Sequence, residues 1–426
     1  MKITAPQPDA RIRLEDIDLA DTGLYTDRDA HLVFQTLRSQ CPVFWQSRAG
    51  GEGFWAVTRR ADVRRVLSEY ESFSSEGGTA LSMLDTPDPA AGIMMHATDP
   101  PRHRELRREL GGRFSAQVVP GYEERIDACV RRAMEPAMDC DDWDVAQAFL
   151  RLPMDVGAFL MGLPDADVEP LLRLAYTSLA PHDPHYAMGA APPAVCAAAA
   201  HTEILGYFAD HICERRARPG DDVISHLISL QIDGAPLDEN AVAVNCLSLL
   251  LGAVVTTSQV ISSLMLALAE QHGGEGRWPA GGSVAALVEE GLRWSSPVIH
   301  FMRRARRDVE LHGVTLRAGD AVTAWIASAN RDESAFDRPY ALDPARSPNR
   351  HLAFGTGPHL CLGANLARLV LATAFRRLMA VVETFEIAGP AVHLVSNEIA
   401  GLVSLPVRTS SRPGSQLRHL GARVSS

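Results

Sequence analysis

The stretch Phe354-Gly355-Thr356-Gly357-Pro358-His359-Leu360-Cys361-Leu362-Gly363 decides how this 426-residue chain is interpreted. It combines a potential thiolate, on Cys361, with an aromatic face, on Phe354. Three residues of the stretch lack a Cβ, so they can take left-handed turns and let a flat ligand approach the main chain: Gly355, Gly357 and Gly363. Few helix breakers follow, so residues 364–375 are predicted to form a helix that begins just after the cysteine. The N–H groups and dipole at such a helix start favour the thiolate form of Cys361.

Taken alone, a cysteine beside a glycine-rich turn is most often a buried structural residue. A single cysteine with no cysteine partner nearby also suits axial ligation of a haem iron. A dinucleotide site is disfavoured, because Leu360 stands where the third glycine of G-x-G-x-x-G would be and no clear strand precedes the stretch.

The complete pattern F-G-x-G-x-H-x-C-x-G resembles the haem-binding loop of the cytochrome P-450 family of haem-thiolate monooxygenases, in its soluble bacterial type. The resemblance extends from about residue 50 to residue 407. It implies haem b as cofactor, with Cys361 as the proximal thiolate ligand. It also implies a mainly α fold with minor β, as a single two-lobed, triangular domain over residues 1–426, with haem buried between a long central helix and the cysteine loop. Residues 1–25 and 409–426 are expected to be disordered.

Composition indicates which partners and which cellular compartment to expect. The formal net charge of −11 argues against general nucleic-acid binding. The seven cysteines are scattered and lack C-x-x-C spacing, so neither a disulfide framework nor a zinc site is indicated, and a reducing cytoplasm is expected. Residues 1–21 are polar and carry acids and prolines, so no signal peptide or membrane anchor is expected. We expect a monomer without a membrane partner.

Helical patterns alternate with two long loops, predicted over residues 72–98 and 180–193, where turn-forming residues are frequent. A strand is predicted over 53–58, and short strand-like pieces over 304–322. Helices are predicted over residues 59–70, 126–174 with breaks at Pro136, Pro153 and Pro164, 194–217, 238–271 and 284–294.

The helix predicted over 238–271 is the longest. Asp238 is its expected N-cap, and Gly273-Gly274 is its expected stop. At about 1.5 Å per residue it would span roughly 50 Å. It is apolar nearly all round, so it should run through the core.

One charged pair has a structural interpretation. Glu290 and Arg293 stand at i and i+3, on one helix face, where most such pairs are only surface ion pairs. The resemblance places them at the family's E-x-x-R motif and adds Arg346 as a third member. It implies a buried network that braces the haem loop, in which loss of one member would be costly.

A second set is implied to bind the haem propionates. His103 and Arg107 stand at i and i+4, so a helix would present both to one carboxylate; the plainer interpretation is a solvated basic face. The resemblance adds Arg303 and His359 as propionate partners. Arg304 is a rival for Arg303, and the alignment favours Arg303.

The central helix carries the motif that the resemblance links to oxygen chemistry. Gly252 and Ala253 are small enough to leave room for dioxygen over the haem. Thr256, followed by Thr257, takes the place of the oxygen-activating threonine, whose hydroxyl can relay a proton. The plainer interpretation of Thr256 is a hydroxyl bonded back to its own helix carbonyl.

Val255 departs from the family pattern, since it stands where an acid is usual. One hypothesis is that protons arrive through water held by Thr256, with Gln259 or a substrate group as a second partner. The other is that the reaction is not simple hydroxylation but oxidative coupling, dealkylation or peroxide-driven chemistry.

The substrate-contacting regions of the family fall on mostly apolar residues, with His300 the conspicuous polar one. A mostly apolar pocket suits a small to medium organic molecule, with oxidation, most simply hydroxylation, as the reaction. The C-terminal strands resemble those of terpene-hydroxylating members, which points to terpenoid or secondary metabolism. The candidate contacts are Met83, Met94, Leu249, Val298, Ile299, His300, Leu402 and Val403.

No flavin, nicotinamide or iron–sulfur segment accompanies the motifs, so a separate ferredoxin and ferredoxin reductase are the expected electron donors. Arginines within 102–113 are expected to form a positive patch beside the thiolate loop for an acidic donor. Two other classes stay open from the residues: a non-catalytic haem-binding or sensor protein, and a structural helical protein without haem.

Overall fold

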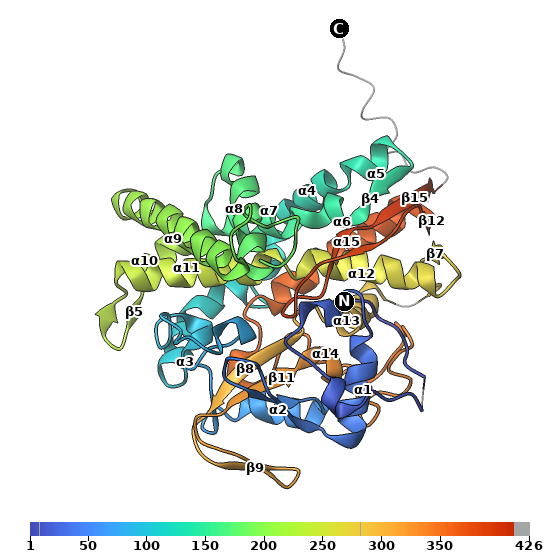
Figure 1. Ribbon diagram of the computed structural model, residues 1–426. Helices are drawn as coiled ribbons and strands as arrows, with labels where there is room; N and C mark the ends of the chain where they lie inside the picture. Colours follow the sequence, from blue (N-terminus) through green and yellow to red (C-terminus); the bar gives the residue numbers. More distant parts are fainter. Residues whose placement is uncertain (8, 282, 413–426) are drawn as a thin grey trace.

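The computed structural model describes residues 1–7, 9–281 and 283–412, and helices dominate it. The α-helices are α1 (Ala30–Gln40), α2 (Arg60–Ser68), α3 (Arg102–Gly111), α4 (Glu123–Ala133), α5 (Glu135–Asp139), α6 (Val145–Leu150), α7 (Leu152–Met161), α8 (Asp165–Leu179), α9 (Pro193–Ala217), α10 (Val223–Ser229), α11 (Glu239–Val254), α12 (Thr257–Glu270), α13 (Val284–Ser295), α14 (Ile326–Ala329) and α15 (Ala364–Val381). In Figure 1 the long helices fill the upper part of the molecule, and α1, α2 and the larger sheet form the lower part.

The strands are short and come from distant parts of the chain. They are β1 (Val43–Gln46), β2 (Phe54–Val57), β3 (Phe73–Ser74), β4 (Asp142–Asp144), β5 (Gln231–Ile232), β6 (Ala235–Pro236), β7 (Glu275–Arg277), β8 (His300–Ala305), β9 (Val309–Leu311), β10 (Val314–Leu316), β11 (Ala321–Trp325), β12 (Val382–Ile387), β13 (Val392–His393), β14 (Leu402–Ser404) and β15 (Pro406–Ser411). The larger sheet has the order β1-β2-β11-β8-β3, in which β2 and β11 are parallel and the other neighbours antiparallel. The second has the order β4-β15-β12-β7.

The predicted helix boundaries agree with the structure wherever a cap or a proline marked them. The Asp238 carboxylate accepts the N–H of Ala241 and begins α11. Pro136 and Pro153 lie in the first turns of α5 and α7, where proline does no harm because the first N–H groups have no helical partner. The predicted loop 180–193 separates α8 from α9.

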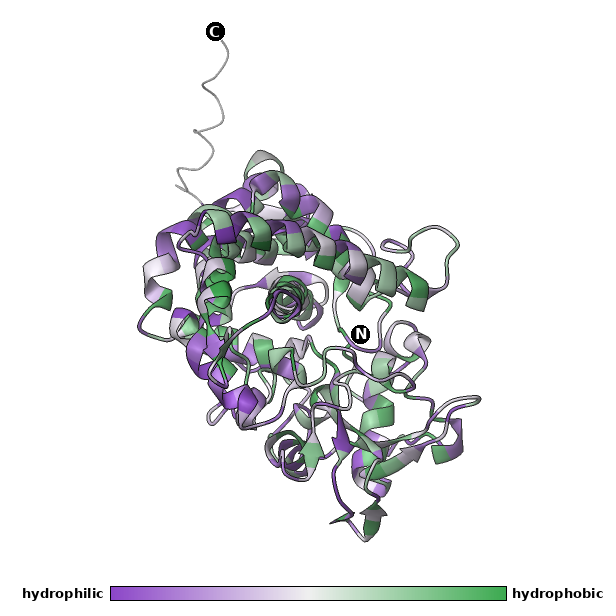
Figure 2. Cartoon of the chain, turned by 90° about the vertical axis from the view of Figure 1, so that its left-hand side faces the viewer, coloured by the Kyte–Doolittle hydropathy of each residue, from purple (hydrophilic) through white to green (hydrophobic). Residues whose placement is uncertain are grey.

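The central helix is the main correction to the sequence-based fold. It is not continuous: α11 ends at Val254, and α12 begins at Thr257. The whole segment Glu239–Glu270 has the length and mean hydropathy of a membrane span, but 67% of its most apolar window is buried inside the protein. Seen from the left of Figure 1, its axis points toward the viewer and other elements surround it (Figure 2). It is therefore a core element, as predicted.

The N-terminal segment, and residues 409–411 near the other end, depart from the predicted disorder. The N-terminal segment packs into a second core cluster, in which Leu19 and Tyr25 are fully buried. The Tyr25 ring stacks at 6.1 Å on that of Trp325, at the end of β11. At the other end, residues 409–411 continue β15, whereas 413–426 lie outside the described residues. These segments are ordered because each buries apolar side chains or completes a sheet.

Candidate functional site

A cavity of about 670 Å³ lies between the α11–α12 segment and the loop that carries Cys361. The first turns of α15 and part of β8 also line it, and most of its lining is apolar. Segments more than two hundred residues apart therefore meet around a single space.

The backbone of the Cys361 loop packs closely against α2. The Cys361 N–H donates to the Phe354 carbonyl at 2.9 Å. Gly355 and Gly357 have φ angles of 69° and 72°, in the left-handed region that favours glycine. A Cβ on Gly357 would lie 2.6 Å from the Cα of Ser68, so the loop could not pack this closely with any side chain there.

Gly363 behaves differently from the sequence-based expectation. Its φ is −84°, so it makes no left-handed turn. It is instead the N-cap residue of α15, which begins after the cysteine as predicted, and it lines the cavity with no heavy atom within 4 Å of an added Cβ. Its lack of a side chain keeps the space beside Cys361 open.

The electrostatics of Cys361 combine opposing effects. Burial raises the pKa of its thiol, while the Gly363 N–H and the charges of Arg107 and Arg368 act to lower it. The net direction is upward, so the helix start alone does not make this thiol acidic, contrary to the expectation from sequence. Coordination to a metal ion deprotonates a thiol outright, which makes the raised pKa compatible with a ligand role.

Four basic side chains line the same cavity: His103, Arg107, Arg303 and His359. The rings of His103 and His359 lie 4.1 Å apart. His103 Nδ1 is buried and has no hydrogen-bond partner in the protein. Arg303 Nη1 donates to the Met302 carbonyl.

Arg107 and Arg303 give the set its positive charge, and no carboxylate in the described part of the chain forms an ion pair with either of them. Burial lowers the pKa of Arg303 to about 10 and that of His103 to about 4. Burial, followed by the charge of Arg303, lowers the pKa of His359 to about 2. Buried cations without counter-ions are costly, so this set favours an anionic ligand. The two propionates of haem have that chemistry, and the donors therefore fit the cofactor implied by Cys361.

Arg304, the rival of Arg303, is placed elsewhere. It pairs with Glu52 and donates to the carbonyls of Gly77 and Leu84, on the other side of β8. Successive residues of a strand point to opposite faces, so only one of the two arginines can reach the cavity.

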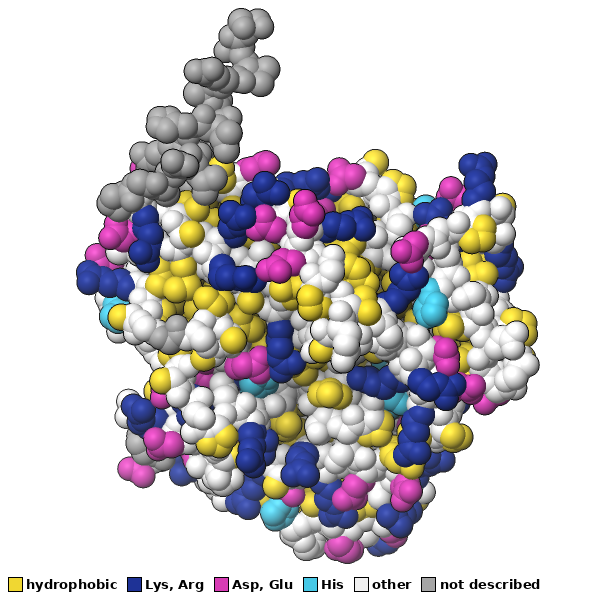
Figure 3. Space-filling view, turned by 180° about the vertical axis from the view of Figure 1, so that it is seen from behind, with side chains coloured by type: hydrophobic (Ala, Val, Ile, Leu, Met, Phe, Trp, Pro, Cys, Tyr) yellow, Lys and Arg dark blue, Asp and Glu magenta, His cyan; other side chains and the backbone are white. Residues whose placement is uncertain are grey.

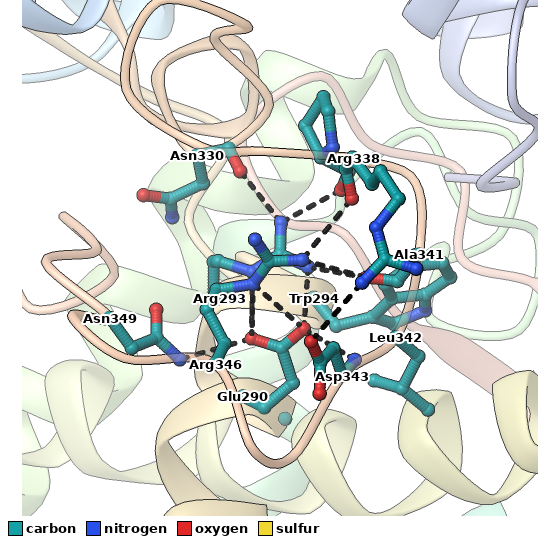
Figure 4. A network of polar contacts seen from close by, with 12 residues as sticks. Glu290, Arg293, Trp294, Asn330, Arg338, Ala341, Leu342, Asp343, Arg346 and Asn349 are labelled. Atoms are coloured by element: carbon teal, nitrogen blue, oxygen red, sulfur yellow. Dashed lines mark hydrogen bonds and ion pairs between the residues drawn. The ribbon is translucent and has the colours of Figure 1, made fainter.

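Glu290 is the centre of a buried network (Figure 4). Its carboxylate accepts two hydrogen bonds from Arg293, at 2.7 and 2.8 Å, and both side chains are 0% exposed. Arg346 Nε lies 3.3 Å from Glu290 Oε2, and Asn349 Nδ2 donates to the same oxygen at 3.0 Å. The remaining donors of Arg293 bond to carbonyls in the segment 330–341. The network thus ties α13 to the chain that leads into the Cys361 loop.

The interruption of the central helix lies at the cavity. Gly252, Ala253, Thr256 and Thr257 all line it, and Gly252 has no atom within 4 Å of an added Cβ. Among the described residues, the Thr256 hydroxyl makes no hydrogen bond to the protein, so it is not bonded back to a helix carbonyl. Val255, which lacks any proton to give, also lines the cavity.

Gln259 does not serve as the proton partner suggested from sequence. Its Oε1 accepts the N–H of Leu402 at 2.7 Å, and its Nε2 donates to the Tyr176 hydroxyl at 3.2 Å. It is 2% exposed and is not part of the cavity lining. Gln259 therefore anchors the C-terminal strands to α12.

The predicted substrate contacts divide into two groups. Met83, Met94, Leu249, Val298 and His300 line the cavity. Ile299, Leu402 and Val403 do not, and this prediction is wrong for them: Ile299 points to the opposite face of its chain segment, and the other two pack in the main core. Ile399 and Glu398 line the cavity in place of Leu402 and Val403.

Polar residues that the sequence did not single out also face the cavity: Asp88, His96, Ser178, His201 and Ser248. They come from the loop before α3 and from three helices. They share no sequence motif, so their common position could not be predicted before the fold was known.

The arginines of the 102–113 segment are less available than expected. Three are paired with acids, and Arg104 lies over the ring of Tyr70 at 5.5 Å. The pairs are Arg102–Asp233, Arg108–Glu109 and Arg113–Asp221. On the rear face of the molecule basic and acidic side chains are likewise interspersed (Figure 3). The positive patch is therefore weaker than the sequence alone indicates.

Comparisons with known proteins agree with this geometry. The sequence profile of the family described as cytochrome P450 matches residues 284–408. Cytochrome P450 NovI of Streptomyces niveus is 36% identical over 404 residues, which cover 93% of this chain and 97% of the relative. Erythromycin C-12 hydroxylase of Saccharopolyspora erythraea is 34% identical over 355 residues, 81% of this chain and 85% of the relative.

A solved structure shows the same fold. That of Mycobacterium marinum cytochrome P450 CYP268A2, in complex with pseudoionone, has a TM-score of 0.83 and 31% identity, covering 92% of this chain and 98% of that one. The predicted fold class and the predicted cofactor are confirmed. The chain belongs to the cytochrome P450 family and is a monooxygenase that uses haem b with a cysteine thiolate as axial ligand.

Proposed function

We propose that this protein hydroxylates a small to medium, mostly apolar organic molecule in terpenoid or secondary metabolism, with electrons from a separate ferredoxin and ferredoxin reductase. The cavity carries the proposal, because Cys361, the four basic side chains and Thr256 surround one mostly apolar space. Two relatives support it: one is an erythromycin hydroxylase, and the other was solved with pseudoionone.

Haem, when bound, supplies the oxygen chemistry in which one atom enters the substrate and the other leaves as water. The chain's residues provide its surroundings. Cys361 is the proposed thiolate ligand, and the glycines of its loop, with Phe354, allow close approach. The proposed propionate ligands are His103, Arg107, Arg303 and His359, and the proposed structural brace is Glu290, Arg293 and Arg346.

The proposed function is tested with the haem-loaded protein, a ferredoxin, its reductase and reduced nicotinamide. A panel of terpenoids and aromatic compounds is first screened for displacement of iron-bound water in the absorption spectrum. A binding compound is expected to raise nicotinamide oxidation and to yield a product heavier by one oxygen atom. Binding without any substrate-dependent oxidation would contradict the proposal.

Arg303→Leu is expected to weaken haem retention. Hydrogen bonds to charged groups contribute about 1.5–3 kcal/mol, so haem should leave roughly tenfold to a hundredfold faster. The transfer rate of haem to an excess of a haem-scavenging protein measures this. Arg304→Leu is the matched control, because Arg304 bonds away from the cavity; equal rates in the two variants would exclude Arg303 as a propionate ligand.

A second candidate is peroxide-driven or coupling chemistry, favoured by Val255 at the usual position of an acid. Among the described residues, the cavity-lining carboxylates are Asp88 and Glu398, and neither lies on α11 or α12. If the wild-type enzyme forms nearly one product for each reduced nicotinamide consumed, this would support hydroxylation in which protons arrive through water held by Thr256. Poor coupling together with efficient peroxide-driven turnover would support the second candidate.

Thr256→Ala is expected to lower the product formed per nicotinamide consumed. Positioned proton donors contribute about 10²-fold or more to a rate, so a tenfold or larger loss of product is expected while nicotinamide consumption largely continues. Thr256→Ser should restore coupling, because it keeps the hydroxyl. Thr257→Ala provides the comparison: a larger loss there would assign the role to Thr257.

A further inference from the structure

Part of the cavity lining is a polar band. Two imidazole–hydroxyl pairs form it. His96 Nδ1 lies 2.7 Å from the Ser248 hydroxyl, and His201 Nε2 lies 2.6 Å from the Ser178 hydroxyl. Asp88, in the loop before His96, completes the band.

Asp88 is the member without a full set of partners. Its Oδ1 accepts the N–H of Ala90 at 2.9 Å, whereas its Oδ2 is buried and has no hydrogen-bond partner. Burial of a carboxylate oxygen without a hydrogen-bond partner costs free energy. This oxygen is therefore expected to accept a hydrogen bond from a group that the chain does not supply. Glu398, the other cavity-lining carboxylate in the described residues, already accepts the N–H of Ser82 at 3.2 Å.

Asp88 is the acidic member of the band. Burial lowers the pKa of His96 to about 4 and also lowers that of His201, so both imidazoles are neutral at pH 7. Asp88 acts to raise the pKa of both rings, while Arg303, which also lines the cavity, acts to lower that of His96. In the described residues no group of three His, Cys, Asp or Glu side chains is placed to hold a metal ion.

The position of the band sets the distance to the reacting end of the cavity. Ser248 and Gly252 are four residues apart on α11, one helical turn, or about 6 Å. Gly252 is the small residue proposed to face the haem. A molecule held at the band would therefore extend its other end toward Gly252 and Thr256, past the apolar side chains of Leu249 and Met94.

We propose that the substrate carries a protonated amine, which binds Asp88 between His96 and His201 while its apolar part reaches toward the haem. An ammonium group supplies the donor that Asp88 Oδ2 lacks and a charge opposite to that of the carboxylate. The imidazoles and their hydroxyl partners can accept the remaining hydrogen bonds of the ammonium group. This inference rests on the proposed function of the same cavity and names its substrate class.

Phenylbutylamine and phenylbutanol are a matched pair of probes with the same apolar body. Calorimetric titration of the haem-loaded wild-type protein is expected to show the amine binding roughly tenfold to a hundredfold tighter, the range of one charged hydrogen bond. Asp88→Asn keeps the shape and the bond to Ala90 but removes the charge, so it should abolish this preference and leave the affinity for the alcohol within about twofold.

The absorption spectrum gives an independent signature. The nitrogen of an amine held at Asp88 is engaged there and not free to bind the iron, so the molecule should displace iron-bound water through its apolar end. In Asp88→Asn the freed amine should turn round and bind the iron through nitrogen, which shifts the spectrum in the opposite direction. Nitrogen ligation already in the wild-type protein would overturn the inference.

Two further variants locate the charge. Asp85→Asn lies in the same loop but pairs with Arg48 outside the cavity, so it should keep the preference for the amine. Loss of that preference in Glu398→Gln, with Asp88→Asn unchanged, would overturn the assignment. In either case retained nicotinamide oxidation that depends on a bound neutral compound, with a product heavier by one oxygen atom, would show that the proposed function stands while the substrate class falls.

Discussion

Replacing Cys361 by alanine is expected to remove the haem-thiolate signature from the reduced, carbon-monoxide-treated protein. Loss of a residue that merely supports a metal ligand costs about 10–100-fold in metal affinity or activity, so loss of the ligand itself should cost more than roughly a hundredfold in turnover. The physical reason is that no other described cysteine lines the cavity, so none can take its place. Absorption spectroscopy and substrate-dependent nicotinamide oxidation measure the two effects.

Cys361→His sharpens this test. It supplies an imidazole in place of the thiolate, so the reduced carbon-monoxide complex should absorb like a histidine-ligated haem protein and turnover should stay lost. Cys213→Ala is the matched control, since Cys213 is exposed on α9 and does not line the cavity. Unchanged pigment and turnover in Cys361→Ala would refute the assignment of the ligand.

Glu290→Gln is expected to give the largest loss of stability. Glutamine keeps the shape of the side chain but leaves the charge of Arg293 buried without its counter-ion. Breaking a buried ion pair costs about 3–5 kcal/mol, a large share of the roughly 5–15 kcal/mol that keeps a protein folded. We expect low yield, a lower urea midpoint and poor haem retention, measured by circular dichroism and haem absorbance.

An exposed glutamate provides the control for this prediction. Glu386 pairs with Arg408, and the two side chains are 53% and 57% exposed. Exposed pairs contribute about 0–1 kcal/mol, so Glu386→Gln should unfold close to the wild-type midpoint. Equal losses in both variants would mean that Glu290 acts as an ordinary surface charge, contrary to its burial.

Local motifs made the centre of the site predictable. The left-handed turns at Gly355 and Gly357 follow from backbone constraints within a short stretch of sequence, whereas the turn expected at Gly363 does not form. The role of Cys361 was implied by the resemblance of the whole stretch to a known family. The start of α11 could be predicted because the Asp238 cap acts within a few residues.

The errors come from non-local contacts and from strand alternation. Leu19 and Tyr25 belong to a polar-looking segment, yet they are buried because Trp325 offers a surface from three hundred residues away. Ile299 was predicted to contact the substrate like its neighbours in the chain. In an extended segment, however, alternate side chains point to opposite faces. The polar band at Asp88 could not be predicted, because its members meet only in the folded chain.

A local feature of the sequence accompanies the interruption of the central helix. Val254, Val255, Thr256 and Thr257 are four consecutive β-branched residues, which restrict side-chain rotation and lower helix propensity. This run contains no glycine or proline, so a prediction based only on helix-breaking residues does not place an interruption there. The sequence therefore contains a cause for the interruption of the helix. It does not show that the interruption would lie at the cavity.

That interruption divides the central segment into two helices with different anchors. The first N–H groups of α12 lack helical acceptors, and the Thr256 side chain does not cap them. The Asp238 carboxylate caps the far end of α11, whereas Gln259 fastens α12 to the C-terminal strands. The boundary between two separately anchored helices therefore coincides with the part of the cavity wall that carries Gly252 and Thr256.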